Sequence, residues 1–553
     1  MKESKHFIEN IIEEDLSSGV QKKDLKFRFP PEPNGFLHIG HVKAIWINFN
    51  LAQKYSSPVV LRFDDTNPEK EEQKYIDAIK EDVKWLGYTW KEERYASDYF
   101  TQLHSWANTL IKQGLAYVDS QTSDTIADQK GTPTKAGKNS PYRNRPVEEN
   151  TDLFSKMTNG TYNEGEHVLR AKIDMASSNM LMRDPVIYRV LKKSHPRTKE
   201  KWKVYPMYDW AHGQSDYIEQ ITHSLCTLEF KPHRELYDWF LDKLVEPNKI
   251  RPKQREFARL NLSHTITSKR KLMFLVEKGI VSGWDDPRMP TISGLRRRGY
   301  PPSALREFVR LAGVAKRENI IEASLLEFCA REELNKTSNR VMVVTNPLKL
   351  NITNYPNDED EIVLSENNPE NPNAGERELP FGKEIYIEQE DFKLEANRKY
   401  FRLTIGKEVR LKSAYIIKAN EAIFDNQNNI KEVLCTYDPK SKSGSGTEES
   451  QRKVKGTLHW VSKKASVKVK VNEYDRLFEH PSPATAQNEE ELLKMVNPES
   501  SKSCFAQAER SLLKAKKGDK FQFQRKGYFI VDNDTPSLMV FNKTVGLRDN
   551  WKK

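Results

Sequence analysis

A short strand that turns directly into a helix is the feature that most constrains this chain. Residues 25–29 form a strand-like run stopped by two prolines, and apolar residues recur at helical spacing over 42–55. Between them stand His38 and His41, which share a helix face because they are three positions apart. The first turn of a helix presents unpaired backbone N–H groups and the positive end of the helix dipole. The segment therefore predicts a phosphate-binding site for a nucleotide.

A second strand-like run follows at residues 58–63, which completes a β-α-β unit. Such a unit implies a parallel, doubly wound sheet, so the fold class is α/β with a Rossmann-type core. Asp64 and Asp65 come directly after this strand. Ligands bind at the carboxyl ends of the strands in open α/β sheets, so both carboxylates become candidates for the site.

The composition describes a large protein with much solvated surface. The chain has 553 residues, 37% hydrophobic and 31% charged, and its net charge of +11 is compatible with a polyanionic partner. No window approaches the about 18 apolar residues of a membrane span, and the N-terminus has no signal-peptide core, so we expect a cytoplasmic protein that does not engage a membrane. The four cysteines are widely scattered, which indicates neither a disulfide framework nor a zinc site.

The pattern changes twice along the chain. Residues 101–205 are mixed and contain a loop-like segment at 131–141, which indicates an insertion that splits the sheet. Helices are expected at 306–311 and 318–334. After residue 340 the apolar period becomes two, with strand-like runs that include 341–344 and 457–461, in an all-β region that suits two barrels better than one. Within it, two stretches rich in Asn, Glu, Pro, Ser and Gly, 354–376 and 438–449, are expected to be long mobile loops.

Two short motifs resemble the signatures of class I aminoacyl-tRNA synthetases. His38-Ile39-Gly40-His41 matches the core of the first signature, and the preceding Pro-Pro-Glu-Pro-Asn-Gly is typical of the glutamine and glutamate branch. The segment 262–272 resembles the Met-Ser-Lys-Arg-Lys loop of that branch, with Thr267 in the usual methionine position. Longer strings at 205–212, 221–230 and 283–291 extend the resemblance over nearly the whole chain, which is most similar to bacterial-type glutaminyl-tRNA synthetases.

The resemblance implies a domain order. A catalytic Rossmann fold would occupy 1–100 and 205–260, interrupted by an acceptor-stem-binding insertion at 101–204. A helical subdomain carrying the second signature would span 261–339, and two anticodon-binding β-barrels would fill 340–553. We expect the protein to act as a monomer.

The resemblance also assigns site residues. His38, His41 and Lys269 would be catalytic. The residues that border ATP would be Glu32, Pro33, Asn34, His38, Ile39, Gly40, His41, Val42, Lys43, Ala44, Thr227, Arg259, Leu260, Thr267, Ser268 and Lys269. Asp64 would hold the amino group of L-glutamine and Tyr208 its side-chain amide, in a pocket completed by Arg28 and Cys226. These roles suit the side chains, because a carboxylate pairs with an ammonium and a phenolic oxygen accepts from an amide.

The implied reaction needs no side-chain nucleophile. The glutamine carboxylate would attack the α-phosphorus of ATP, and the 2′-hydroxyl of the terminal adenosine of tRNA(Gln) would then take the acyl group. Catalysis would be positioning plus electrostatic stabilisation, with Mg²⁺ carried on the ATP phosphates and no metal site on the protein.

Two alternatives remain open. The glutamate-specific sister enzyme shares both signatures, but it carries arginine where this chain has Cys226, because a buried carboxylate without a counter-charge is costly. A neutral thiol favours the neutral amide. The second alternative is a catalytically silent tRNA-binding relative, against which the intact signatures argue.

The tRNA-facing residues follow from the resemblance less directly. Arg340, Arg402 and Arg410 match residues that contact the anticodon, and Pro133 stands where an apolar wedge meets the first acceptor base pair. Four positions depart from the best-known pattern: Pro232, Lys399, Phe401 and Lys412. Pro232 replaces an aspartate that reads the acceptor stem, which predicts that discrimination there is weakened or moved to neighbouring groups. Phe401 is compatible with base stacking or with a place in the core.

Overall fold

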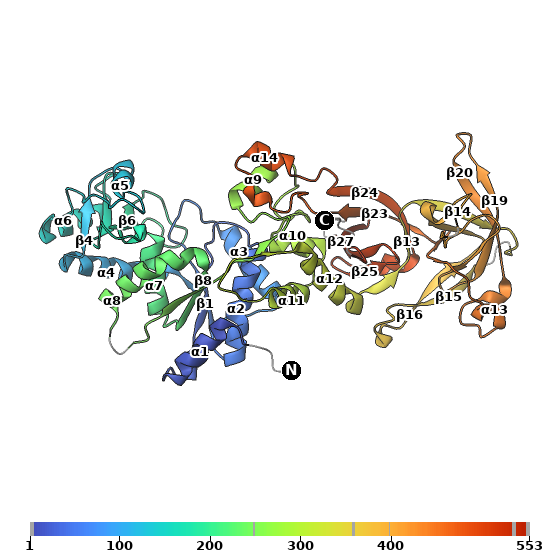
Figure 1. Ribbon diagram of the computed structural model, residues 1–553, viewed down its shortest axis with the longest axis horizontal. Helices are drawn as coiled ribbons and strands as arrows, with labels where there is room; N and C mark the ends of the chain where they lie inside the picture. Colours follow the sequence, from blue (N-terminus) through green and yellow to red (C-terminus); the bar gives the residue numbers. More distant parts are fainter. Residues whose placement is uncertain (1–4, 247–248, 357–359, 398, 533–537, 549–553) are drawn as a thin grey trace. The chain divides into compact units, whose positions relative to one another are not determined.

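The computed structural model describes residues 5–246, 249–356, 360–397, 399–532 and 538–548. The chain divides into two compact units (Figure 1). The first comprises Met1–Asn261 and Val309–Ile321, and the second comprises Leu262–Phe308 and Glu322–Lys553. Three elements lie where the chain passes between the units: β10 (Asn261–Leu262), α11 (Pro302–Ala312) and β11 (Ile320–Ile321).

A parallel sheet organises the first unit. Its strands are β1 (Phe27–Phe29), β2 (Val59–Phe63) and β3 (Glu92–Tyr95), paired in the order β1-β2-β3. A second parallel pair, β8 (His223–Thr227) and β9 (Lys253–Phe257), continues beside β1, where the Thr222 amide donates to the Lys26 carbonyl at 3.1 Å. All residues of β1 and β2 are buried, as expected for parallel strands covered on both faces. The α/β class with a parallel-sheet core is thereby confirmed.

Helices and a smaller antiparallel sheet complete this unit. The antiparallel sheet contains β4 (Ala116–Asp119), β5 (Val168–Ala171), β6 (Val186–Val190) and β7 (Val204–Pro206). It has its own core, in which Phe154, Leu169 and Tyr188 are fully buried or nearly so. The helices are α1 (Phe7–Ser17), α2 (Ile39–Tyr55), α3 (Gln73–Trp85), α4 (Phe100–Lys112), α5 (Ser123–Gln129), α6 (Val147–Thr158), α7 (Tyr208–Ile218) and α8 (Arg234–Leu244).

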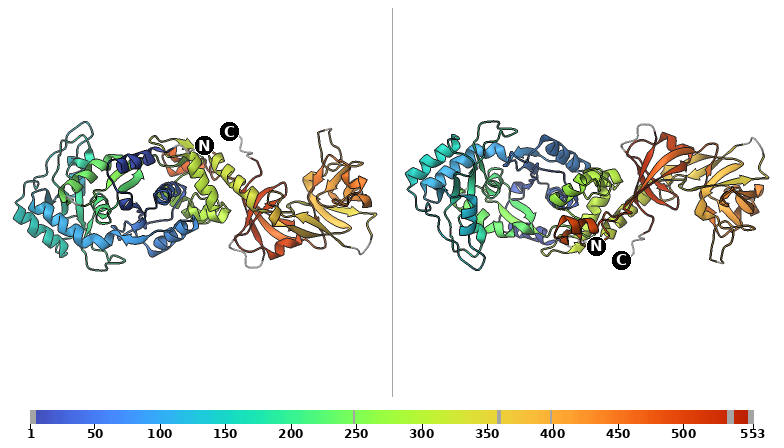
Figure 2. Two further views of the ribbon diagram at one scale, coloured as in Figure 1. Left: turned by 90° about the horizontal axis from the view of Figure 1, so that it is seen from below. Right: turned by 90° about the horizontal axis from the view of Figure 1, so that it is seen from above.

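The second unit contains two seven-stranded sheets, each curled into a barrel-like form (Figure 2). One has the order β12-β25-β26-β27-β23-β24-β13 and the other β21-β18-β19-β20-β14-β17-β22. In each case the first and last strands are neighbours along the chain. Only Met342 separates β12 (Asn339–Val341) from β13 (Val343–Val344), and two residues separate β21 (Thr457–Leu458) from β22 (Val461–Ser462). The sheet must therefore bend round on itself, which confirms the expectation of two barrels.

The remaining strands of the first barrel are β23 (Val467–Tyr474), β24 (Ser501–Ala508), β25 (Lys520–Phe523), β26 (Gly527–Val531) and β27 (Val540–Val545). Those of the second barrel are β14 (Pro347–Ile352), β17 (Glu384–Glu388), β18 (Glu408–Leu411), β19 (Ile416–Phe424) and β20 (Ile430–Tyr437). The helices of this unit are α9 (Lys269–Glu277), α10 (Ile292–Arg298), α12 (Ala323–Thr337), α13 (Glu448–Gln451) and α14 (Glu489–Lys494).

Three expectations about local structure are wrong. The stretch 354–376, expected to be a mobile loop, contains β15 (Glu361–Glu366), which pairs with β16 (Glu376–Phe381); residues 357–359 lie outside the described residues. The alternating apolar pattern of β15 extends over few residues and is flanked by polar ones, so the composition of the stretch indicates a loop instead. The single strand expected at 341–344 is two, because Met342 separates β12 from β13. The single strand expected at 457–461 is two, because β21 and β22 lie at opposite edges of one sheet.

No helix within the described part of the chain combines the length and apolar character that crossing a membrane requires.

Candidate active site

The two histidines cap the helix that follows the first strand. Nδ1 of His38 accepts from the Gly40 amide at 3.1 Å, and Nδ1 of His41 accepts from the His38 amide at 3.1 Å. An Nδ1 that accepts a hydrogen bond leaves the ring proton of a neutral imidazole on Nε2. The rings lie 4.0 Å apart between centroids. Both side chains therefore carry their Nε2 donors at the positive end of α2, which begins at Ile39 because His38 is its N-cap.

This end of α2 has the features of a nucleotide cradle. A Cβ at position 40 would lie 2.9 Å from Cε1 of His38, so only glycine leaves the ring in place. Lys43, one turn further, is 3% exposed, and burial lowers its pKa to about 8. A buried amine of this kind is stabilised in its charged form by an anion, and the residues present thus fit a bound phosphate chain.

Below the sheet edge, two arginines and three carboxylates form a buried cluster. Arg62 donates to Asp64 at 2.9 Å, to Asp216 at 2.8 Å and to Glu219 at 3.0 Å. Arg28 donates from Nε to Asp216 at 3.0 Å. Burial alone would raise the pKa of Asp216, but Arg28, His212 and Arg62 hold it well below its usual range. Asp216 is therefore ionised at neutral pH, whereas burial raises the pKa of Glu219 above its ordinary value.

One oxygen of this cluster lacks a hydrogen bond. Asp64 has a 5% exposed side chain, and within the described residues its Oδ2 accepts no hydrogen bond; the nearest partner, Nδ1 of His212, is 3.6 Å away. Burial opposes ionisation of this carboxyl, but Arg62 and His212 lower its pKa. An ionised, buried oxygen without a donor fits an incoming ammonium group.

Tyr208 and Cys226 border the same cluster. The Tyr208 ring stacks on His212, with 5.0 Å between centroids, and burial raises the pKa of its hydroxyl well above the ordinary value. Burial also raises the pKa of the Cys226 thiol to about 12. Both groups are therefore uncharged across the physiological range. The structure places Arg28, Asp64 and Cys226 near Tyr208, since each of them influences the pKa of its hydroxyl.

Asp216 and Glu219 were not anticipated from the sequence, although a signal for one of them exists. Tyr208, His212 and Asp216 recur every four residues along α7, so they share one helix face. A polar stripe of this kind on a helix whose residues are otherwise buried indicates an internal polar network. Glu219 follows the end of α7 and does not belong to this polar stripe, so the sequence gives no such signal for it.

The other predicted residues of the first unit lie at strand ends. Thr227 ends β8, and its hydroxyl donates to Glu229 at 2.7 Å. Arg259 is half-exposed, with Glu229 at 3.6 Å and Glu318 at 3.4 Å, whereas the neighbouring Leu260 is buried.

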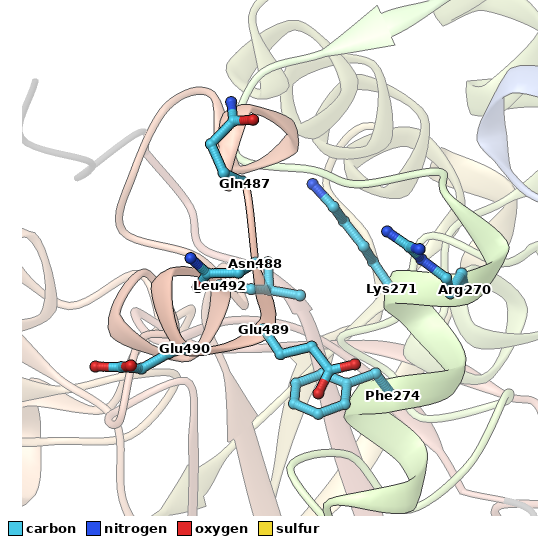
Figure 3. Close-up of a pocket in the computed structure, with 8 residues that line it drawn as sticks. All are labelled: Arg270, Lys271, Phe274, Gln487, Asn488, Glu489, Glu490 and Leu492. Atoms are coloured by element: carbon cyan, nitrogen blue, oxygen red, sulfur yellow. The ribbon is translucent and has the colours of Figure 1, made fainter.

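Thr267, Ser268 and Lys269 belong to the second unit, where Ser268 is the N-cap of α9 and Lys269 its first residue. The helix is fixed by Lys271, whose ammonium donates to the carbonyls of Ala484 at 2.8 Å and Ala486 at 2.7 Å. Figure 3 shows Arg270 and Lys271 on α9 facing the segment before α14 across a cavity of about 480 Å³. Lys271 of this signature segment is thus bound to the β23–β24 connection.

Comparison with known proteins settles the family. Residues 24–336 match the model described as tRNA synthetases class I (E and Q), catalytic domain, and 338–438 and 457–532 match the two anti-codon binding domain models of that group. The glutamine–tRNA ligase of Bradyrhizobium diazoefficiens is 51% identical over 99% of this chain and 97% of its own length. That of Salmonella choleraesuis is 52% identical over 99% of this chain and 98% of its own. The chain belongs to the glutamine–tRNA ligases.

Among solved structures, a glutamate tRNA ligase from Elizabethkingia meningosepticum has a TM-score of 0.44 and 19% identity, and the match covers 57% of this chain and 71% of that one.

In this glutamine–tRNA ligase, Arg340, Arg402 and Arg410 lie within the first anti-codon binding match. Arg340 and Arg410 line one cavity of about 890 Å³, together with Lys412 and Lys442. Arg402 lies elsewhere, with Nη1 at 3.1 Å from Oδ1 of Asp391. Pro133 is exposed in the turn after α5. The structure therefore groups two of the three arginines and separates the third.

Proposed function

We propose that this chain joins L-glutamine to tRNA(Gln) with the consumption of ATP, and that the two charged centres of the first unit divide the work. The N-terminus of α2 takes the nucleotide and the buried cluster takes the amino acid. The proposal rests on one observation: Oδ2 of Asp64 accepts no hydrogen bond from the described residues and lies beside the uncharged Tyr208 and Cys226. That arrangement suits an ammonium on one side and a neutral amide on the other.

The nucleotide is held by the residues that form the start of α2. His38 and His41 donate from Nε2 to phosphate oxygens, and the same charge stabilises the protonated form of Lys43. Glu32, Pro33, Asn34, Thr227, Arg259 and Leu260 border the adenosine. Lys269, with Thr267 and Ser268, neutralises charge as pyrophosphate departs. When bound to ATP, Mg²⁺ supplies further neutralisation of the phosphates.

The metal would be carried by the nucleotide rather than by the protein. No group of three or more His, Cys, Asp or Glu side chains in the described ranges could hold a metal ion. Removal of Mg²⁺ with a chelator should therefore abolish adenylate formation without changing the thermal stability of the free protein.

Amino acid selection follows from the charge of the pocket. Asp64 binds the glutamine ammonium, Tyr208 accepts from the amide NH₂, and Cys226 offers no counter-charge to a second carboxylate. Arg28 is occupied by Asp216, Ser224 and the Leu225 carbonyl. A glutamate side chain would thus enter a site without an available cation.

The tRNA is read at two places. Arg340, Arg402 and Arg410 contact the anticodon, and Pro133 packs against the first acceptor base pair as an apolar wedge. Pro232, whose carbonyl accepts from Asn179 at 2.9 Å, offers no side-chain acceptor to the acceptor stem. Discrimination at pairs 2–71 and 3–70 is therefore weaker than in relatives with an aspartate there.

The test compares amino acids on one tRNA. Purified enzyme, ATP and tRNA(Gln) transcript are given glutamine or glutamate, and aminoacylation is followed by acid-gel or radiolabel assay. Preferential glutamine charging supports the proposal, whereas preferential glutamate charging overturns it. Failure to exchange pyrophosphate despite bound tRNA would indicate a silent relative. Mass measurement in solution tests the predicted monomeric state.

A further inference from the structure

An exposed aromatic ring stands in the first anti-codon binding region. Phe401 is 52% exposed, which excludes the core position that its sequence context left open. A single exposed phenylalanine is ordinary on a protein surface, so exposure alone does not indicate a function. The residues around Phe401 do indicate one.

The loop that presents Phe401 is anchored on both sides. The Tyr400 hydroxyl donates to the Glu390 carbonyl at 3.0 Å, and the Leu403 amide donates to the Asp391 carbonyl at 3.0 Å. Arg402 adds an ion pair to the fully buried Asp391. The ring is therefore held outward by a fixed backbone, and little conformational freedom is lost when a partner packs against it.

A cationic side chain lies beside the ring. The Lys455 ammonium lies 5.5 Å from the ring centroid, and Arg402 is the next residue. The strand that carries Arg410 is close: the carbonyl of Gly456 accepts from the Arg410 amide at 2.8 Å. A Cβ at position 456 would lie 2.5 Å from the Phe401 carbonyl oxygen, so glycine permits this approach. A flat apolar face among cations is the combination that binds unpaired nucleotides.

We propose that Phe401 is a stacking platform for one unpaired base of the anticodon loop. The inference rests on the proposed function, because it requires tRNA(Gln) as the partner. The ring packs against the face of the base, and Lys455 and Arg402 meet the adjoining phosphates. Stacking is tolerant of base identity, so Phe401 contributes affinity and Arg410 contributes the reading of base edges.

The chain supplies a matched control. Phe505, on β24 of the other barrel, is 55% exposed and has the Lys468 ammonium 4.2 Å from its ring centroid. It therefore resembles Phe401 in exposure and in its cationic neighbour. Both rings are on the surface, and leucine at either position should leave the fold intact.

The experiment uses the full-length enzyme with Phe401→Leu, Phe401→Trp and Phe505→Leu, and the KM for tRNA(Gln) is measured in aminoacylation. Phe401→Leu should raise this KM about tenfold with a smaller effect on kcat, whereas Phe401→Trp and Phe505→Leu should stay within about twofold of the parent. The loss should persist across salt concentrations, because stacking does not release counterions.

A spectroscopic readout identifies the base. 2-Aminopurine is placed in turn at each anticodon-loop position, and the quenching that binding causes should disappear at one position in Phe401→Leu only. Unchanged KM and quenching in Phe401→Leu, or an equal loss in Phe505→Leu, would overturn the inference. If the parent enzyme charges tRNA(Gln) normally, a result that overturns the inference about Phe401 leaves the proposed function intact. If the parent enzyme does not charge tRNA(Gln), the proposed function itself is wrong.

Discussion

Arg28 and Asp216 form an ion pair at 3.0 Å in which neither side chain has exposed surface. Asp216 also accepts from Arg62, Ser224 and Tyr237, so its carboxylate is the centre of the network beneath the proposed glutamine pocket. Networks of this kind fix side chains more than they add stability, but loss of one partner leaves a buried charge unpaired.

Asp216→Asn should therefore lower the free energy of unfolding by about 3–5 kcal/mol, measured by chemical denaturation. The control is Asp98→Asn, which removes a half-exposed partner of Arg197 at 2.6 Å and should cost about 0–1 kcal/mol. Similar losses in the two variants would contradict the assigned role of Asp216.

Lys269 and Lys271 should differ although they are two residues apart. Lys269→Met should lower kcat about 100-fold or more, since it removes a cation proposed to stabilise the transition state. Lys271→Met should lower kcat less than tenfold and should increase protease cleavage within 478–492, because it releases the Ala484 and Ala486 carbonyls. Lys278→Met, at the other end of α9, should change neither. Equal kinetic losses at 269 and 271 would show that Lys271 also meets substrate.

Glu71 should make stability fall as pH rises. Burial, followed by the nearby Asp65, raises the pKa of its carboxyl to about 9, and its buried Oε2 accepts no hydrogen bond within the described residues. The unfolded chain ionises near the ordinary value of 4.5, so between about 4.5 and 9 the unfolded state loses a proton that the folded state retains. The contribution of Glu71 is fully present below pH 4.5 and is lost progressively up to pH 9.

Replacement by glutamine removes this titration. Glu71→Gln should gain stability relative to the parent as pH is raised from 5 to 8, by up to about 1.4 kcal/mol per pH unit. Denaturant unfolding at several pH values measures the difference between the two proteins. Parallel curves would show that Glu71 ionises normally.

Arg410 should restrain the segment before β21. Its Nη1 donates to the Ser441 carbonyl at 3.0 Å and its Nη2 to the Ser450 carbonyl at 2.8 Å. Arg410→Lys cannot reproduce this fork, so tryptic cleavage at Lys442 and Arg452 should accelerate several-fold. Arg402→Lys, which leaves these bonds intact, serves as the control. Unchanged cleavage in Arg410→Lys would assign the arginine to RNA contact alone.

Local patterns predicted the parts of this enzyme that depend on local sequence. The strand, the turn and the helix around His38 follow from proline, glycine and apolar spacing, and they appear as β1 and α2. The pairing of Arg28 with Asp216, 188 residues apart, does not follow from any local pattern. The same holds for Lys271, whose carbonyl partners lie more than 200 residues away. Long-range polar contacts depend on the tertiary arrangement, and periodicity carries no information about them.

The barrels also show why short strands are hard to predict from sequence. The composition of β15 indicates a loop, because only Val363 and Ser365 face inward, while Ile362 and Leu364 are exposed among acidic residues. β12 and β13 read as one run because the interruption at Met342 is itself apolar.

The placement of the outermost strands has a further consequence for each barrel. The two edge strands of each barrel meet at a seam, where they are joined by covalent backbone: Met342 in one barrel, and His459 and Trp460 in the other. Elsewhere in each barrel, neighbouring strands are joined by hydrogen bonds. Cleavage of a single peptide bond at either place would release the two edge strands of that barrel from each other, and free edges recruit strands from other molecules. Each seam is therefore a point where one nick could turn a closed sheet into a template for aggregation.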